Sequence, residues 1–366
     1  MLITKTYTNF TSLPITEKTF YISLFFTNFL GIYLTFYGSI YSLLPLTISI
    51  FTFITTILIL LYSGNSFIKQ ILTYILYVIL AIHLPLFFLA TARSNINRPL
   101  YDETLLKIDT FLLGWLWKKG QMGLYLDTSP TLNPTTQLGI FIGDVLQIFY
   151  FMYYIIPYCC IYLYQLVKCI KTTVHYYKHN TEHVNHKKHW NDLYFMTTVY
   201  VFTYFQIFFI NSLFPAISPR LYLEHEYQNK LELTGLSGWI HKTFRDNNSA
   251  NSFPSGHVAE SLCVSLALFR MGSYVFGSVI LICSLLIATA TLFLRYHYAV
   301  DCLFGFIIAG VSFAIGCFTY EKLSYSEEQQ QQQAESKQSN SSSLQHTSTS
   351  TTEEEKYLFS NDEADV

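Results

Sequence analysis

Two histidines and an aspartate lie in short strings whose residue types suit phosphoryl transfer. His257 closes a Pro-Ser-Gly-His string, and His297 is followed four residues later by Asp301. Residues four apart share one face of a helix, so we expect Asp301 to hold one tautomer of the His297 imidazole and to raise its nucleophilicity. A nucleophilic histidine with a second histidine to move protons predicts a phosphoryl-transfer site.

Five further residues are candidates for holding phosphate. A helix is expected to begin after Ser255, and helix N-termini bind phosphate oxygens, while Gly256 lets the backbone approach closely. An arginine can bind phosphate through two parallel hydrogen bonds. For Arg220 and Arg295 the competing interpretation is a side chain that extends toward lipid headgroups. The predicted phosphate contacts are Arg98, Arg220, Ser255, Gly256 and Arg295.

The composition indicates which elements must position these residues. The chain is 51% hydrophobic and only 13% charged, and its apolar residues come in long runs. Runs of about 20 residues can cross a bilayer core of about 30 Å. We therefore predict an all-α, polytopic membrane helix bundle rather than a soluble core, with about eight spans. The predicted spans are 21–42, 46–63, 71–91, 140–167, 193–214, 257–271, 273–294 and 298–319.

Three regions follow from this pattern. Residues 1–92 form a cytosolic N-terminal segment and three spans, residues 93–320 form the catalytic membrane domain, and residues 321–366 form a cytosolic tail. The tail contains a run of five glutamines and clusters of serine and glutamate. Because it holds almost no apolar residues, it is predicted to be disordered.

The connection at about 168–192 fixes the predicted topology. It is rich in lysine and histidine, and short cation-rich connections stay in the cytosol. Counting spans outward places both termini in the cytosol and all three arginine- and histidine-bearing motifs on the opposite, lumenal side.

A metal site and a cofactor are not predicted. His175, His179 and His183 repeat every four residues, as zinc ligands on a helix do, but only Glu182 accompanies them and a solvated turn is favoured. The seven cysteines show no disulfide or metal spacing and are interpreted as packing residues. No nucleic-acid partner is predicted, and protein partners are not indicated.

Taken in order, the motifs resemble a known family. Arg98-Pro99, the Pro-Ser-Gly-His string and the His-x-x-x-Asp string are similar to the type 2 phosphatidic acid phosphatase and haloperoxidase superfamily, and most closely to its inositol phosphorylceramide synthase branch. The resemblance runs from about Arg98 to about Gly305 and implies a six-helix catalytic core. It implies that His297 attacks phosphorus to form a phosphohistidine. His257 would protonate the leaving oxygen and then deprotonate the acceptor.

Departures from the phosphatase pattern bear on the substrate. Phosphatases of the superfamily carry a lysine and a serine-arginine pair where this chain has Thr91, Ala290 and Thr291. A phosphate monoester carries about −1.5 to −2 charges, so a site with fewer cations suits a diester with one. Against this, Gly256 is the phosphatase-like residue, because fungal synthases of the branch have leucine there.

The resemblance therefore implies a transferase that moves phosphoinositol from phosphatidylinositol to ceramide and releases diacylglycerol. It implies a lumenal site in the Golgi, or the endoplasmic reticulum, and these membrane lipids as partners. The alternatives are a lipid phosphate phosphatase, a synthase that uses a choline or ethanolamine headgroup, and a catalytically silent scaffold or lipid transporter.

Overall fold

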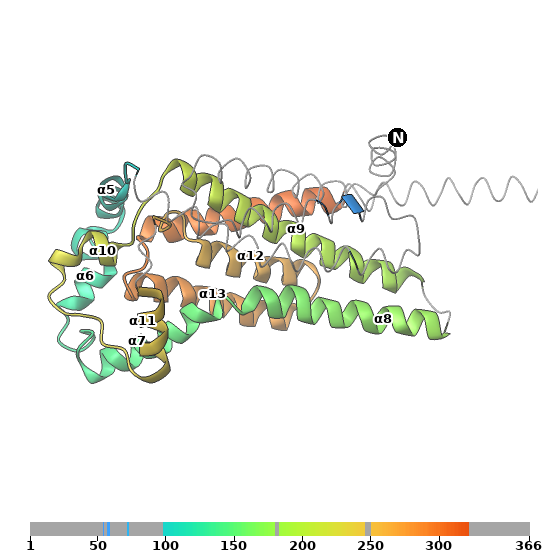
Figure 1. The fold of residues 1–366 in the computed structure, drawn as a ribbon, viewed down its shortest axis with the longest axis horizontal. Coiled ribbons are helices and arrows are strands. Elements are labelled where there is room, and N and C mark those ends of the chain that lie inside the picture. Colours follow the sequence, from blue (N-terminus) through green and yellow to red (C-terminus); the bar gives the residue numbers. More distant parts are fainter. Residues whose placement is uncertain are drawn as a thin grey trace, which may run out of the picture. The chain divides into compact units, whose positions relative to one another are not determined.

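The computed structural model describes residues 98–179, 183–245 and 250–321, together with residues 54, 57, 58 and 72. These residues form helices and connecting turns, and no strand is found among them, as the all-α prediction requires. Figure 1 shows the ribbon. In chain order the longer ranges hold α5 (Asp102–Leu113), the 3₁₀ helix η2 (Lys118–Gly120), α6 (Met122–Asp127), α7 (Gln137–Met152), the π-helix η3 (Tyr158–Tyr164), α8 (Gln165–His179), α9 (His183–Leu213), α10 (Pro219–Tyr222), the 3₁₀ helix η4 (Glu224–Glu226), α11 (Gly235–Arg245), α12 (Gly256–Arg270), α13 (Tyr274–Phe293) and a helix at Ala299–Glu321, hereafter the 299–321 helix.

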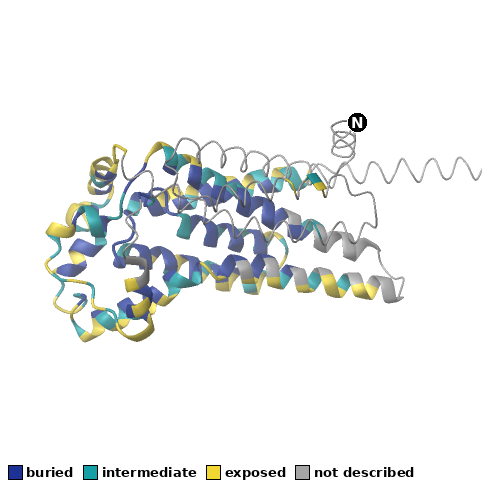
Figure 2. Ribbon diagram, viewed as in Figure 1, coloured by how far each residue is buried: buried dark blue, intermediate teal, exposed yellow. Residues whose placement is uncertain are grey.

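The helix α12 is largely buried in the bundle. It packs against α9 and α13, while α13 also packs against α7, and Figure 2 shows it largely buried. The 299–321 helix lies close to the start of α12. A Cβ at Gly305 would be only 2.8 Å from the carbonyl oxygen of Ser255. Glycine is needed at that position. The close approach brings the starts of two helices together.

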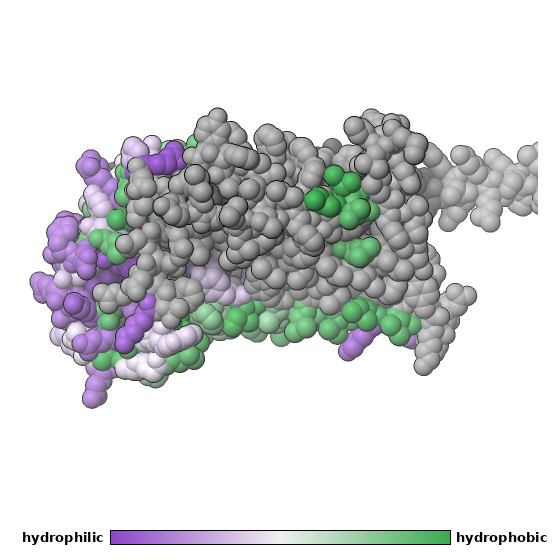
Figure 3. All heavy atoms as spheres, viewed as in Figure 1, coloured by the Kyte–Doolittle hydropathy of each residue, from purple (hydrophilic) through white to green (hydrophobic). Residues whose placement is uncertain are grey.

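Three helices of the described residues are long and apolar enough to cross a membrane: Asn191–Leu213, Tyr274–Phe293 and Ala299–Glu321. On α13 the exposed side chains Val275, Val279 and Ile282 recur at helical spacing. An apolar face of this kind suits contact with lipid chains, where helices satisfy their own backbone groups. Figure 3 shows hydrophobic residues along the helices and hydrophilic ones gathered at one end.

The eight predicted spans are not all seen. The first three, at 21–42, 46–63 and 71–91, lie outside the described residues except for residues 54, 57, 58 and 72. The predicted span at 140–167 is not one continuous α-helix, because α7 ends at Met152 and is followed by turns, the π-helix and α8. The predicted connection at 168–192 is largely helical, since α8 continues to His179 and α9 begins at His183. Lysine is a good helix former, so a cation-rich segment without glycine or proline remains helical.

The chain divides into two compact units, Met1–Cys317 and Phe318–Val366. Only residues 318–321 of the second unit are described, and the three predicted regions stay predictions. In the first unit α5, α6, α10 and α11 gather at one end of the bundle (Figure 1). At this end α9 and α13 finish and α12 begins, so it holds all three motifs.

Candidate active site

The turn after α13 fixes the position of His297. Arg295 N donates to the carbonyl oxygen of Leu292 (3.2 Å), and Tyr296 N donates to that of Thr291 (2.8 Å). These two bonds form the Schellman motif that commonly ends helices. Its left-handed residue is Arg295, with a φ of 64°, at a position where glycine is usual. The amide of His297 also donates to Thr291 (3.1 Å), so the turn is tied firmly to α13.

The surroundings of the His297 ring define its tautomer. Nδ1 lies 2.8 Å from the carbonyl oxygen of Ser252 and 3.1 Å from Oδ2 of Asp301. Both atoms are acceptors, so Nδ1 carries the proton and Nε2 keeps its lone pair. Nε2 lies 3.3 Å from Nδ1 of His257. The structure thus brings the two predicted histidines and the predicted aspartate into one chain of contacts.

Asp301 reaches His297 by a different local structure from the predicted one. His297 lies in the turn before the 299–321 helix, not on it, and Tyr298 occupies the N-cap position. Oδ2 of Asp301 accepts from Tyr298 N (3.0 Å) and from Ser252 Oγ (2.6 Å). The first bond is half of a capping box, in which the third helical residue reaches back to the N-cap amide. One carboxylate oxygen therefore caps the helix and orients the imidazole.

Two aspartates of α5 complete the start of this helix. Ala299 N and Val300 N each donate to Asp109 at 2.8 Å, and Tyr298 Oη donates to Asp102 at 2.8 Å. The amides at a helix start otherwise lack partners. The sequence did not predict a role in this site for either aspartate, because neither role is visible without the packing of α5 against a helix almost 200 residues later.

The Asp109 carboxyl gives a pH-dependent prediction. Burial raises its pKa to about 6 from 3.8, against the lowering effect of its backbone hydrogen bonds. The folded state then binds the proton more tightly than the unfolded chain, so the stabilisation from this group is complete below about pH 4 and is lost as pH rises through about 6. The pKa difference corresponds to about 3 kcal/mol. We expect Asp109→Asn to remove this slope from thermal unfolding measured between pH 4 and 7.

The exposed carboxyl of Glu103, on the same helix, provides the matched control. Glu103→Gln is expected to leave the slope of the unmodified protein in place. Burial also raises the pKa of Asp102 to about 6. Its contribution to the pH dependence of stability therefore remains in every variant. An Asp109→Asn variant with the full slope of the parent would contradict the assignment.

His257 stands at the start of α12 against two tyrosine rings. The ring centroid of Tyr150 lies 4.3 Å away in a stacked arrangement, and that of Tyr153 lies 4.2 Å away and is tilted. Its Nδ1 faces His297, whereas its Nε2 is buried without a hydrogen-bond partner among the described residues. Buried polar atoms are normally satisfied. The open Nε2 is therefore the atom of this ring that remains available to a bound group.

The buried carboxylate of Glu260, one turn further along α12, binds Tyr153, whose ring packs against His257. Tyr153 Oη donates to Oε1 of Glu260 (3.0 Å), Tyr200 Oη donates to Oε2 (3.4 Å), and Tyr204 hydrogen-bonds to Tyr153 (2.9 Å). Glu260 is 1% exposed. No motif predicted this cluster. The only sequence signal was a glutamate within an apolar run, a position at which ionisable residues are rare and functional by default.

Ser255 and Gly256 lie where they were expected, at the start of α12. Oγ of Ser255 is fully buried and has no hydrogen-bond partner among the described residues, while its amide donates to the carbonyl oxygen of Asp301 (3.0 Å). A Cβ on Gly256 would lie 3.3 Å from Oε1 of Glu260. A leucine here would press on that carboxylate, so glycine and the buried glutamate are matched. Their phosphate-binding roles stay predictions.

The three arginines are placed differently. Arg98 is exposed and donates to the carbonyl oxygen of Ser212 (2.6 Å). The guanidinium of Arg220 lies 5.0 Å from the Tyr296 ring. Arg295 is 5% exposed and forms a buried ion pair with Asp127 at 2.9 Å, which sequence reasoning did not foresee. The ion pair is a structural role of Arg295, and its contact with phosphate stays a prediction.

No group of three or more histidine, cysteine, aspartate or glutamate side chains suited to a metal ion occurs in the described part of the chain. The side chains of His179 and His183 are not among those described, so the histidine-rich segment stays a prediction.

The fold and the site together define an all-helical membrane protein with a His-His-Asp centre at the polar end of its bundle. The chain belongs to the PAP2 superfamily, whose family model matches residues 121–315. A PA-phosphatase related-family protein from Dictyostelium discoideum is 34% identical over 307 residues, or 78% of this chain and 53% of the relative. The chain thus spans about half the length of that relative. No solved structure gave a significant match.

Proposed function

We propose that the chain is a phosphotransferase that moves a phospho-headgroup from a glycerophospholipid to a lipid alcohol. The observation that carries the proposal is the ordered chain of contacts from Asp301 and Ser252 through His297 to His257. It gives His297 a lone pair on Nε2 and places a second imidazole 3.3 Å away. A nucleophile held by an orienting group beside an acid–base partner is the general requirement for covalent catalysis.

In the first step Nε2 of His297 attacks phosphorus, and the bond from phosphorus to the diacylglycerol oxygen breaks. Protonated His257 gives its proton to that oxygen. In the second step His257 takes the proton of the acceptor hydroxyl, whose oxygen attacks phosphorus while the bond from nitrogen to phosphorus breaks. The contact between Nε2 of His297 and Nδ1 of His257 must open when phosphorus binds, because phosphorus and the His257 ring would need the same lone pair of Nε2.

The site environment favours a diester. Thr291 is fully buried, donates from Oγ1 to the carbonyl oxygen of Ala288 (2.7 Å) and lies 3.2 Å from Sγ of Cys302. The arginine that phosphatases carry at this place would therefore not fit without repacking. Thr91 lies outside the described residues. A site with fewer cations stabilises a singly charged phosphodiester relative to a monoester.

Our most specific proposal, which rests on family resemblance, is transfer of phosphoinositol from phosphatidylinositol to ceramide in the Golgi, at a lumenal site. A second candidate is a lipid phosphate phosphatase. It is favoured by Gly256 and by the similarity to the Dictyostelium PA-phosphatase related-family protein. In that case water replaces the acceptor hydroxyl in the second step.

The deciding experiment uses the whole chain, purified and reconstituted with fluorescent ceramide. Phosphatidylinositol, phosphatidylcholine, phosphatidylethanolamine and phosphatidic acid are supplied in turn, and products are identified by mass. We expect phosphoinositol ceramide and diacylglycerol from the first donor. Brisk phosphate release from phosphatidic acid, with no phosphosphingolipid from any donor, would replace the transferase proposal by the phosphatase one.

A further inference from the structure

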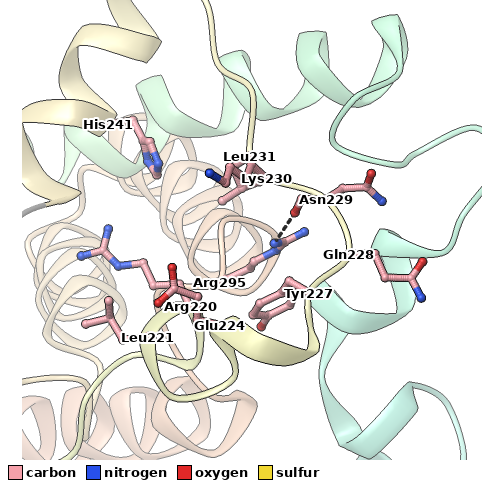
Figure 4. Close-up of a pocket in the computed structure, with 10 residues that line it drawn as sticks. All are labelled: Arg220, Leu221, Glu224, Tyr227, Gln228, Asn229, Lys230, Leu231, His241 and Arg295. Atoms are coloured by element: carbon pink, nitrogen blue, oxygen red, sulfur yellow. Dashed lines mark hydrogen bonds between the residues drawn. The ribbon is translucent and has the colours of Figure 1, made fainter.

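A cavity of about 390 Å³ lies beside the histidine pair, at the polar end of the bundle. Figure 4 shows it between α10, the segment 227–231, α11 and the turn at Arg295. Its volume is within the range of about 300–1,000 Å³ for small-molecule sites. Neither catalytic histidine lines it. It is thus a compartment separate from the histidine pair, although it shares Arg220 and Arg295 with the predicted phosphate contacts.

An aromatic layer joins this cavity to the reaction centre. His241, which lines the cavity, hydrogen-bonds through Nδ1 to Tyr296 Oη (2.7 Å), and Tyr296 immediately precedes His297. The Tyr296 ring stacks on Tyr150 (4.4 Å between centroids), which in turn stacks on His257. The side chain of Tyr296 therefore links the lining of the cavity to the histidine pair.

The charges of the lining exclude a cationic ligand. Arg220, Lys230 and Arg295 line the cavity, and Glu224 is the one carboxylate among its described lining residues. Arg295 forms an ion pair with Asp127, which lies outside the lining, and the described lining side chains together carry three cations and one anion. Like charges brought together in a partly dehydrated space repel each other strongly. The lining therefore suits an anionic or uncharged group.

The aromatic face that would attract a quaternary ammonium is already occupied. Such ligands are recognised by cation–π contact with tyrosine or tryptophan rings. Here the guanidinium carbon of Arg295 lies 3.8 Å from the centroid of the Tyr227 ring. The guanidinium is also fixed by bonds to Asp127 and to the carbonyl oxygen of Asn229, both 2.9 Å. Its Nε is buried without a hydrogen-bond partner in the described residues, which leaves a donor for an incoming oxygen.

We propose that this cavity binds the headgroup of the donor lipid and selects a polyhydroxylated, uncharged or anionic headgroup over a quaternary ammonium. The inference rests on the proposed transferase function. Arg220, at the Tyr296 side, lies nearest the phosphate, while Glu224 and Lys230 contact headgroup hydroxyls farther out. Glu224 accepts hydrogen bonds and Lys230 donates them.

Binding is measured without turnover, on the detergent-solubilised whole chain, with myo-inositol 1-phosphate, phosphocholine and inorganic phosphate as probes. We expect myo-inositol 1-phosphate to bind at least about tenfold more tightly than either of the others, a difference of about 1.4 kcal/mol. Lys230→Glu should weaken its binding at least tenfold. Lys107→Glu, at an exposed lysine of α5 outside the cavity, is the matched control and should change nothing.

The reconstituted enzyme gives the second readout. Lys230→Glu and Glu224→Gln should raise KM for phosphatidylinositol at least about tenfold more than KM for phosphatidic acid, which has no headgroup beyond its phosphate. Equal affinity for the three probes, or unchanged binding and KM in both variants, would overturn the inference. If the probe ranking holds but no donor is turned over, the proposed function fails while the binding site stands. If transfer occurs but the ratio of KM for phosphatidylinositol to KM for phosphatidic acid is unaltered in both variants, the proposed function stands while the binding site fails.

Discussion

Alanine at His297 should abolish phosphoryl transfer, whereas alanine at Asp301 should leave measurable turnover. The first change removes the atom that forms the covalent intermediate. The second leaves the nucleophile in place and removes one of the two groups that hold Nδ1, while the other, the carbonyl oxygen of Ser252 (2.8 Å), remains. In a well-studied nucleophile–base–orienter triad, loss of the nucleophile costs about 10⁶-fold in kcat and loss of the orienter about 10⁴-fold. Losses in that order are expected here, measured as initial rates on the reconstituted variants.

Because Asp301 also caps the 299–321 helix, the two effects need separation. Asp301→Asn keeps an oxygen for the Tyr298 amide and should fold with nearly parental stability, yet its rate should stay close to that of the alanine variant. Labelled donor should transfer phosphorus to protein in the Asp301 variants and not in His297→Ala. Near-parental rates in a well-folded His297→Ala protein would refute the mechanism.

Alanine at Asp127 should destabilise the protein by about 3–5 kcal/mol, since it leaves the Arg295 guanidinium buried without its counter-charge. The two side chains are 2% and 5% exposed. The carboxylate also accepts from Gln228 N (2.7 Å) and Asn229 N (3.2 Å), so the segment that lines the cavity loses its attachment as well. Thermal unfolding in detergent should show a large fall in midpoint.

A second substitution distinguishes unpaired charge from simple loss of packing. Arg295→Gly, made together with Asp127→Ala, removes the charge and gives the left-handed turn the residue that adopts it without strain. We expect the double variant to recover part of the lost stability. A double variant as unstable as the sum of the two single changes would mean that the ion pair contributes nothing specific.

Local sequence patterns predicted those parts of the site that neighbouring residues build. The spacing of His297 and Asp301 predicted their contact, and the Pro-Ser-Gly-His string predicted the start of α12 and the position of Ser255. The apolar runs at 193–214, 273–294 and 298–319 match, to within a few residues, the three described helices that are long and apolar enough to cross a membrane. The superfamily follows from the same motifs, whereas the inositol phosphorylceramide synthase branch remains our proposal.

Roles that depend on distant packing were not predictable in this way. Nothing near Asp109 in sequence indicates that it caps a helix 190 residues later, and Ser252 gains its role only where the loop before α12 meets the turn after α13. Arg295 was expected at phosphate because arginines near such motifs often are. Its pairing with Asp127 depends on the fold of α6 and the segment 227–229, which no periodicity reveals.

The two α5 carboxylates set a lower limit on the part of the chain that can work alone. The superfamily match begins at residue 121, but Asp102 and Asp109 lie before it and hold the Tyr298 side chain and the first two helical amides beside the reactive histidine. A fragment trimmed to the matched stretch would keep every motif histidine and still lack these attachments. The unit that can perform the proposed function therefore begins no later than Asp102, and a minimal version of the protein must include α5.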